Sequence, residues 1–341
     1  MFQVEPLLWL QSFASPFTVW FWGSITWLGT VKCLAAVVFF LAFAVRFRVG
    51  MAVLVLLLVN SLATDLLKDH YAIPRPGDVD QRVRQLGGDG VHPLAAQGGA
   101  TGFWSPLPDS TLAAARDSAD LSYAFPSGHV SSAAALTLSM ALLLRVRRQA
   151  RSRRGLWLLA AVWIPLTGLS RLFLGRHYVA DVFGGAALGA AVALFGWLLF
   201  GEQVLGLERG AAAPWRRAAL LVLAGTVLLL AVFVPGTDIV AVGRLVALVM
   251  LFFLLPAPAF DEDVEPLFRL ARMAVAIVLP FAAAPALNAA FEALGLAASP
   301  RVSMISEAIL ILVAFGGGAL AARFIPIAGR DRVRRATVGE A

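Results

Sequence analysis

The stretch Ser170-Arg-Leu-Phe-Leu-Gly-Arg-His-Tyr-Val-Ala-Asp181 stands between two strongly apolar runs, at about 156–174 and 178–200. Each run is long enough to cross about 30 Å of hydrocarbon as an α-helix. A helix that begins near Gly175 would place His177 and Asp181 on one face, where the carboxylate can hold the imidazole. Arg171 lies six residues before His177, so the segment between them must bend back to bring the two side chains together. The bend implies a shared ligand, which we expect to be an anion.

The composition of the whole chain fits the same architecture. Of the 341 residues, 60% are hydrophobic and 14% are charged, and the mean hydropathy is +0.80, whereas soluble domains are about 45–50% apolar. Seven further apolar runs lie near 25–45, 51–67, 127–145, 218–235, 239–256, 271–294 and 303–323. The alternating pattern of β-barrel strands is missing from the sequence. The sequence therefore predicts an all-α fold, a polytopic transmembrane helical bundle.

The positions of the arginines predict how the chain is oriented. The net charge of +7 does not indicate a nucleic-acid partner, because the arginines lie in short loops between apolar runs. Such loops mark the cytoplasmic side of a membrane. Their alternation along the chain puts the N-terminus, the long loop 69–125 and the Arg171–Asp181 stretch on the extracytoplasmic side, which is the periplasmic face of a bacterial inner membrane. Cys33 is the only cysteine, which excludes an intramolecular disulfide and a cysteine-based metal site.

Two further polar clusters open onto the same predicted side. Lys68 ends the second apolar run and is followed after six residues by Arg75-Pro76. The segment Phe125-Pro-Ser-Gly-His129 begins the third run, where Pro suits a first helical turn and Ser suits a cap. The backbone N–H groups of Ser127, Gly128 and His129 would then point toward the extracytoplasmic end of the helices. A helix N-terminus attracts phosphate. His129 is placed to give a proton to a leaving oxygen.

Each cluster taken singly has an ordinary structural explanation: a cation that closes a span, a plain helix start, or an ion pair near the membrane surface. Taken together, the clusters bring three cations, helix N-terminal N–H groups and two histidines to the extracytoplasmic end of the predicted helices. These groups suit a dianionic ligand and acid–base chemistry, which are the requirements of phosphoryl transfer.

The three clusters resemble the three signature motifs of the type 2 phosphatidic acid phosphatase (PAP2) superfamily, and the resemblance covers roughly residues 25 to 200. It implies a phosphatase that needs neither a metal ion nor a cofactor. His177 would attack phosphorus to form a phosphohistidine, Asp181 would orient His177, and His129 would protonate the leaving group. The phosphate oxygens would be held by Lys68, Arg75, Arg171 and the Ser127–Gly128 backbone.

The resemblance also suggests a division of the chain into four parts. These are an interfacial amphipathic segment (1–24), a PAP2-type catalytic core (25–205), a C-terminal extension of about four further transmembrane helices (206–325) and a basic cytoplasmic tail (326–341). The extension loosely resembles that of the sphingosine-phosphate phosphatase branch. Within it, Arg244 and Glu307 are costly in a membrane unless they are paired, so we expect an ion pair between them.

The preferred interpretation is a membrane phosphatase that acts on a lipid phosphate monoester or pyrophosphate, with membrane lipids as its surroundings. One alternative is a phosphotransferase that forms the same intermediate and passes phosphate to another lipid. The other is a transporter or receptor that binds a lipid phosphate without turnover. Binding alone needs cations and N–H donors but not two histidines, which favours an enzyme. The sequence determines neither the particular lipid nor the oligomeric state.

Overall fold

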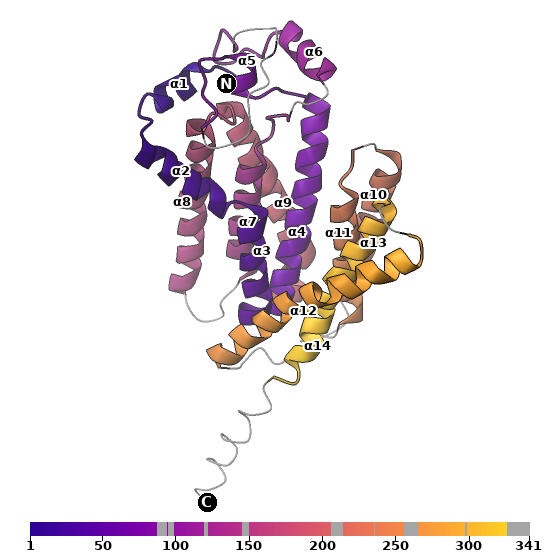
Figure 1. Ribbon diagram of the computed structural model, residues 1–341. Coiled ribbons are helices and arrows are strands. Elements are labelled where there is room, and N and C mark those ends of the chain that lie inside the picture. Colours follow the sequence, from indigo (N-terminus) through magenta and orange to yellow (C-terminus); the bar gives the residue numbers. More distant parts are fainter. Residues whose placement is uncertain are drawn as a thin grey trace, which may run out of the picture. The chain divides into compact units, whose positions relative to one another are not determined.

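The computed structural model describes the chain apart from residues 87–93, 95–98, 119–121, 145–149, 206–213, 235, 256–264, 297–298 and 326–341. The predicted basic tail, 326–341, lies outside the described residues, as do parts of the long loop 69–125 and of the arginine-rich loops. The side chains of residues 150–153, 202–205, 214 and 216–217 are not described either. The described residues form helices and connecting segments without any strand (Figure 1). The predicted all-α fold is confirmed.

The helices follow one another in this order: α1 (Glu5–Gln11), α2 (Pro16–Leu28), α3 (Val31–Phe40), the π-helical turn η1 (Leu41–Val45), α4 (Phe47–Tyr71), α5 (Pro76–Val79), α6 (Asp109–Asp117), α7 (Gly128–Leu143), α8 (Ala150–Phe173), α9 (Val179–Leu205), α10 (Pro214–Phe233), α11 (Ile239–Leu254), α12 (Pro266–Ala293), α13 (Pro300–Ile311), the π-helical turn η2 (Leu312–Gly317) and α14 (Gly318–Ala322).

Several helices have the length and composition of membrane spans. Five stretches pass both criteria: Phe47–Val79, Arg154–Phe173, Val179–Gly201, Pro266–Ala293 and Pro300–Ala322. The pair Pro16–Leu28 and Val31–Val45, bent by 50° at Gly29-Thr30, would make a sixth span. Three shorter apolar helices are Gly128–Leu143, Ala218–Phe233 and Ile239–Leu254. Each predicted apolar run therefore coincides with a helix or with a bent helix pair, and the chain is a polytopic membrane protein.

The chain folds into two compact units. The first contains Met1–Leu34 and Val59–Gly201, and the second contains Ala35–Leu58 and Glu202–Ala341. Residues 35–58 fall within the predicted catalytic core, yet they pack with the C-terminal helices. They do so through apolar packing, since the ring centroids of Phe43 and Phe47 lie 5.8 and 6.3 Å from that of Phe315 in η2. The four-part division by function remains a proposal.

The second unit contains the ion pair predicted between α11 and α13. Arg244 donates from Nε and Nη2 to the same Glu307 carboxylate oxygen, at 3.0 and 2.9 Å. Both side chains are about one-third exposed, so neither charge is left alone in an apolar environment. The expected Arg244–Glu307 pair is confirmed.

In the first unit, the part of α4 from Val59 onward, α7, α8 and α9 run side by side, and the N-terminus, α5 and α6 gather at one end of these helices (Figure 1). The α4–α7 contact is polar at its centre, since the Asn60 amide donates to the Ser131 hydroxyl at 3.0 Å. The α7–α9 contact is close, because a Cβ atom at Gly189 would overlap the Ser131 carbonyl oxygen and the Ala134 methyl group. Small residues allow such close approach between membrane helices.

Replacing Gly189 with alanine is therefore expected to lower the midpoint of thermal unfolding in detergent. Neither the Ser131 carbonyl nor the α7 backbone can move aside without separating α7 from α9, and overpacking of this kind costs about 1–3 kcal/mol. Gly225→Ala in α10 is the matched control, because nothing lies within 4 Å of its added Cβ and alanine favours a helix. An unchanged midpoint for Gly189→Ala would show that α7 and α9 are not in close contact.

Candidate active site

His177 and Asp181 lie together at the start of α9, in the first unit. His177 Nδ1 is 3.3 Å from Asp181 Oδ2, and the same oxygen accepts the Tyr178 N–H at 2.7 Å. Both side chains are buried. The carboxylate therefore sets the tilt of the imidazole and, by accepting a hydrogen bond from Nδ1–H, leaves the lone pair on Nε2.

The helix start near Gly175 that we expected is wrong, although the His177–Asp181 contact is present. Helix α9 begins at Val179, so His177 lies just before it, and Asp181 reaches back from the first turn. Gly175 has a φ of +71°, the left-handed conformation in which glycine ends helices. Gly175 thus terminates the helix before it, α8, instead of starting α9.

The segment between Arg171 and His177 bends back as the spacing predicted. The Arg176 N–H donates to the Arg171 carbonyl at 3.0 Å, and the Gly175 N–H donates to the Leu172 carbonyl at 3.0 Å. These bonds close a tight turn at the end of α8. The turn brings the last-turn residue Arg171 to the base of the segment that carries His177.

The start of α7 differs from the prediction in its hydrogen bonds. The Ser127 N–H donates to the Asp181 carbonyl at 3.0 Å, and the Ser127 side chain makes no capping bond. This N–H group is therefore not available to a ligand, and Ser127 occupies the predicted N-cap position without its side chain capping the helix. The Gly128 and His129 N–H groups lie in the first turn of α7, where a helix provides them with no acceptor. The bond from Ser127 joins the second predicted motif to the third.

Four cationic side chains surround the two histidines. The charges of Arg171, Lys68, Arg75 and Arg176 all act on His129, and those of Arg171, Arg75 and Lys68 act on His177. They come from separate elements: the last turn of α4, the residue before α5, the last turn of α8, and the turn that follows α8. The structure thus brings all three predicted clusters to one place. So many like charges are costly together, and a dianion would relieve their repulsion.

Two buried polar atoms point to the same kind of ligand. In the part of the chain that the structure describes, the Ser127 hydroxyl oxygen and Arg171 Nε are buried and have no hydrogen-bond partner. A buried donor without an acceptor is unfavourable, and the oxygen atoms of an anion would supply one to each. Among these described residues no three His, Cys, Asp or Glu side chains gather in an arrangement that suits a metal ion.

Burial lowers the pKa of His177 well below its ordinary value, and the nearby charges of Arg171, Arg75, Lys68 and His129 lower it further. The imidazole is therefore neutral in the folded protein at pH values where a solvated histidine is protonated. A neutral ring keeps the lone pair that a nucleophile or a base needs.

The lowered pKa of His177 predicts how stability changes with pH. Unfolding returns His177 to a pKa of about 6.5, so below that pH the unfolded chain binds a proton that the folded protein does not. This contribution to stability is present above about pH 6.5 and is lost as the pH falls toward the lowered pKa, by at most about 1.4 kcal/mol per pH unit. Thermal unfolding in detergent across this range, compared with His177→Asn, measures it. An equal decline in both proteins would contradict the prediction.

The sequence analysis did not select two residues that the structure places at the site. Arg176 directly precedes His177 and is buried. The sequence could have indicated it, because it is a cation next to the proposed nucleophile. Gly29, at the break between α2 and α3, lies so close to His129 that an added Cβ would be 3.1 Å from the imidazole Cδ2. In the sequence, Gly29 is recognisable as an interruption of an apolar run, and such an interruption does not indicate which residue the glycine contacts.

The region that contains the site is similar to known proteins. Residues 49–204 match the model of the PAP2 superfamily. Over 70 residues the chain is 36% identical to phosphatidylglycerophosphatase B of Bacillus subtilis (strain 168), a match that covers 20% of this chain and 34% of that protein. The chain thus spans about a third of the length of this curated relative. The crystal structure of Aquifex aeolicus LpxE aligns with a TM-score of 0.40 at 20% identity, covering 57% of this chain and 94% of that one.

The fold and the site define a polytopic helical membrane protein with a buried cationic site around two histidines. The region from residue 49 to residue 204 is similar to the PAP2 superfamily. Every candidate site residue from Lys68 to Asp181 lies within this region.

Proposed function

We propose that the protein is an integral membrane phosphatase that hydrolyses a lipid phosphate monoester or pyrophosphate through a phosphohistidine. The observation that carries this proposal is the pairing of a buried, neutral His177, held by Asp181, with a ring of four cations and a second histidine. The family of residues 49–204 and the name of the Bacillus subtilis relative support the same chemistry.

In the proposed reaction, Lys68, Arg75, Arg171, the Ser127 hydroxyl group and the N–H groups that begin α7 hold the phosphate oxygens. Nε2 of His177 donates its lone pair to phosphorus while the bond from phosphorus to the lipid oxygen breaks. His129 gives its proton to that leaving oxygen, so a neutral lipid alcohol departs from a monoester, and a lipid monophosphate departs from a pyrophosphate. Water then attacks phosphorus, His129 accepts a proton from the water, and the N–P bond breaks to return neutral His177. Asp181 keeps the ring oriented in both steps.

Phosphate release from a panel of lipids tests this proposal. Purified protein in detergent is given phosphatidate, phosphatidylglycerol phosphate, a sphingoid phosphate, an isoprenoid pyrophosphate and a lipid A phosphate, each with and without EDTA. We expect release from at least one of them that EDTA does not reduce. A folded protein that binds these lipids but releases no phosphate would support the binding alternative. Transfer of labelled phosphate to an added lipid alcohol without free phosphate would support the transferase.

We further propose that the site faces the periplasm, as the arrangement of arginines suggests. A membrane-impermeant maleimide tests this in intact spheroplasts of a Cys33→Ser background. Ser110→Cys in α6 and Arg154→Cys near the start of α8 are both exposed positions. We expect Ser110→Cys to react and Arg154→Cys to react only after lysis. The opposite pattern would place the site on the cytoplasmic side.

A further inference from the structure

Gln11, the last residue of α1, is a buried amide whose hydrogen bonds join distant parts of the first unit. Its side-chain nitrogen donates to the Phe173 carbonyl at 3.0 Å and to the Arg84 carbonyl at 2.6 Å. Its side-chain oxygen accepts the Arg84 N–H at 3.0 Å. The Arg84 guanidinium also donates to the Gln11 backbone carbonyl at 3.0 Å. The residue is 3% exposed, so water does not compete for these bonds.

The two segments that Gln11 joins each adjoin a cluster of the candidate site. Phe173 is the last residue of α8, two residues before Gly175 and four before His177. Arg84 belongs to the segment that follows Arg75 and α5, and the next bond along it, from the Leu86 N–H to the Leu174 carbonyl, measures 3.1 Å. Gln11 therefore spans the gap between the first and third clusters.

The turn at Gly175 packs tightly against Gln11 and Arg84. A Cβ atom at Gly175 would collide with the Arg84 carbonyl and would lie 2.9 Å from the Gln11 amide nitrogen. A displacement of Gln11 or of Arg84 is thus transmitted directly to the turn, since nothing compressible lies between them. Phe173 is the last residue of α8, where carbonyl groups have no partner within the helix, and Arg84 is not helical, so their backbone groups depend on such a side chain for partners.

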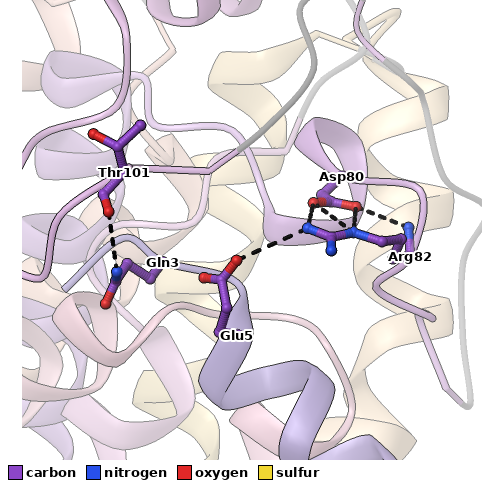
Figure 2. Close-up of polar contacts among 5 residues, drawn as sticks. All are labelled: Gln3, Glu5, Asp80, Arg82 and Thr101. Carbon is purple, nitrogen blue, oxygen red and sulfur yellow. Dashed lines mark hydrogen bonds and ion pairs between the residues drawn. The ribbon is translucent and has the colours of Figure 1, made fainter.

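Apolar packing holds the rest of the N-terminal segment, residues 1–11, at the same place. Val4 and Leu7 are buried in a cluster with Val83, Leu172 and Tyr178, the last of which follows His177. The polar contacts farther out are weaker: Figure 2 shows Gln3 reaching the Thr101 carbonyl, at 3.4 Å, and Glu5 lying 3.9 Å from Arg82, which Asp80 also holds. Gln11 thus supplies the buried polar side chain of the N-terminal segment, alongside apolar side chains, exposed side chains and backbone hydrogen bonds.

We propose that Gln11 is a positioning residue for the reaction: it fixes the turn that carries His177 relative to the segment that follows Arg75, and so aims the imidazole at the bound phosphate. This inference rests on the proposed function of His177 as the nucleophile. Lys68 and the N-terminus of α7 belong to helices that the Gln11 side chain does not hold, whereas Arg171 lies inside α8, two residues before the Phe173 contact. Loss of the amide therefore impairs the attack on phosphorus much more than it impairs phosphate binding.

The test uses the full-length protein in detergent with p-nitrophenyl phosphate and with the best lipid substrate. Gln11→Met keeps the length of the side chain but removes its polar atoms, and Gln11→Glu keeps an acceptor for the Arg84 N–H. Gln3→Met is the matched control, because it makes the same chemical change on the same segment away from the turn. Thermal unfolding and size-exclusion chromatography report folding, and His177→Ala reports whether the proposed nucleophile is used at all.

We expect both Gln11 variants to fold and to lose at least about tenfold in kcat, since a misplacement of about 1 Å can cost about 100-fold. KM and the inhibition constant of inorganic phosphate should change less than about threefold, and Gln3→Met should match the wild type. A wild-type kcat in the Gln11 variants, or variants that fail to fold while Gln3→Met folds, would overturn the inference and leave the proposed function standing. Full activity of His177→Ala would instead overturn the proposed function.

Discussion

Replacing His177 with alanine is expected to lower the rate of phosphate release at saturating substrate by at least about 1,000-fold. The reason is that no other group takes over the attack: His177 is the imidazole that Asp181 orients, and its burial keeps it neutral. The loss should be the same for lipid substrates and for p-nitrophenyl phosphate, because both reactions require the N–P bond to form as the leaving group departs. Colorimetric phosphate and nitrophenol assays on purified protein measure it.

His70→Ala is the control for this change. His70 lies in the last turn of α4 near Lys68 but is exposed, with its ring against Tyr71, and we expect normal activity from it. Folding of His177→Ala is checked by its thermal midpoint and by its stabilisation with orthovanadate, which the cations still bind. If folded His177→Ala kept a tenth of wild-type activity, His177 would not be the nucleophile.

Replacing His129 with alanine is expected to separate the two halves of the reaction. With lipid substrates the rate should fall by about 100- to 10,000-fold, because an alkoxide leaves slowly without a proton donor. Nitrophenolate needs no proton to leave, so His177 should still be phosphorylated by p-nitrophenyl phosphate. The next step should be slow, since water then lacks the base that activates it. Stopped-flow absorbance should show a burst of about one nitrophenolate per protein, followed by slow turnover.

The same burst measurement contains its own control. The double variant His129→Ala, His177→Ala should give no burst, since nothing is left to accept the phosphoryl group. If His129→Ala alone gave slow turnover without a burst, His129 would act before or during attack on phosphorus instead of on the leaving group and water. If its activity on lipids were normal, the proposed role of His129 would be wrong.

The sequence predicted the helical membrane fold because the burial of apolar side chains in hydrocarbon follows directly from composition and run length. It also predicted the Arg244–Glu307 pair, since an isolated charge among apolar helices needs a partner. The three polar clusters were recognisable because their residue types and spacings are themselves chemical requirements. The structure brings them together, and their roles in catalysis remain proposals.

Other features depended on geometry that a linear pattern does not contain. The helix start was misplaced because Gly175 can begin or end a helix in sequence, and only its positive φ decides which. The Ser127 N–H was assigned to phosphate, whereas the Asp181 carbonyl, distant in sequence, takes it. Gln11 gave no signal at all, because its partners are backbone carbonyl and N–H groups, which every residue carries. The grouping of residues 35–58 with the C-terminal helices likewise follows from packing alone.

If phosphate passes through His177, the phosphohistidine can be trapped. His129→Ala, in which the intermediate should persist, is mixed with a lipid substrate or p-nitrophenyl phosphate that carries radiolabelled phosphate and is denatured in base within the burst. We expect about one label per protein, stable in base, released in acid, and located by peptide mapping at His177. A label on another residue, or none while nitrophenolate is still produced in a burst, would contradict the proposed role of His177.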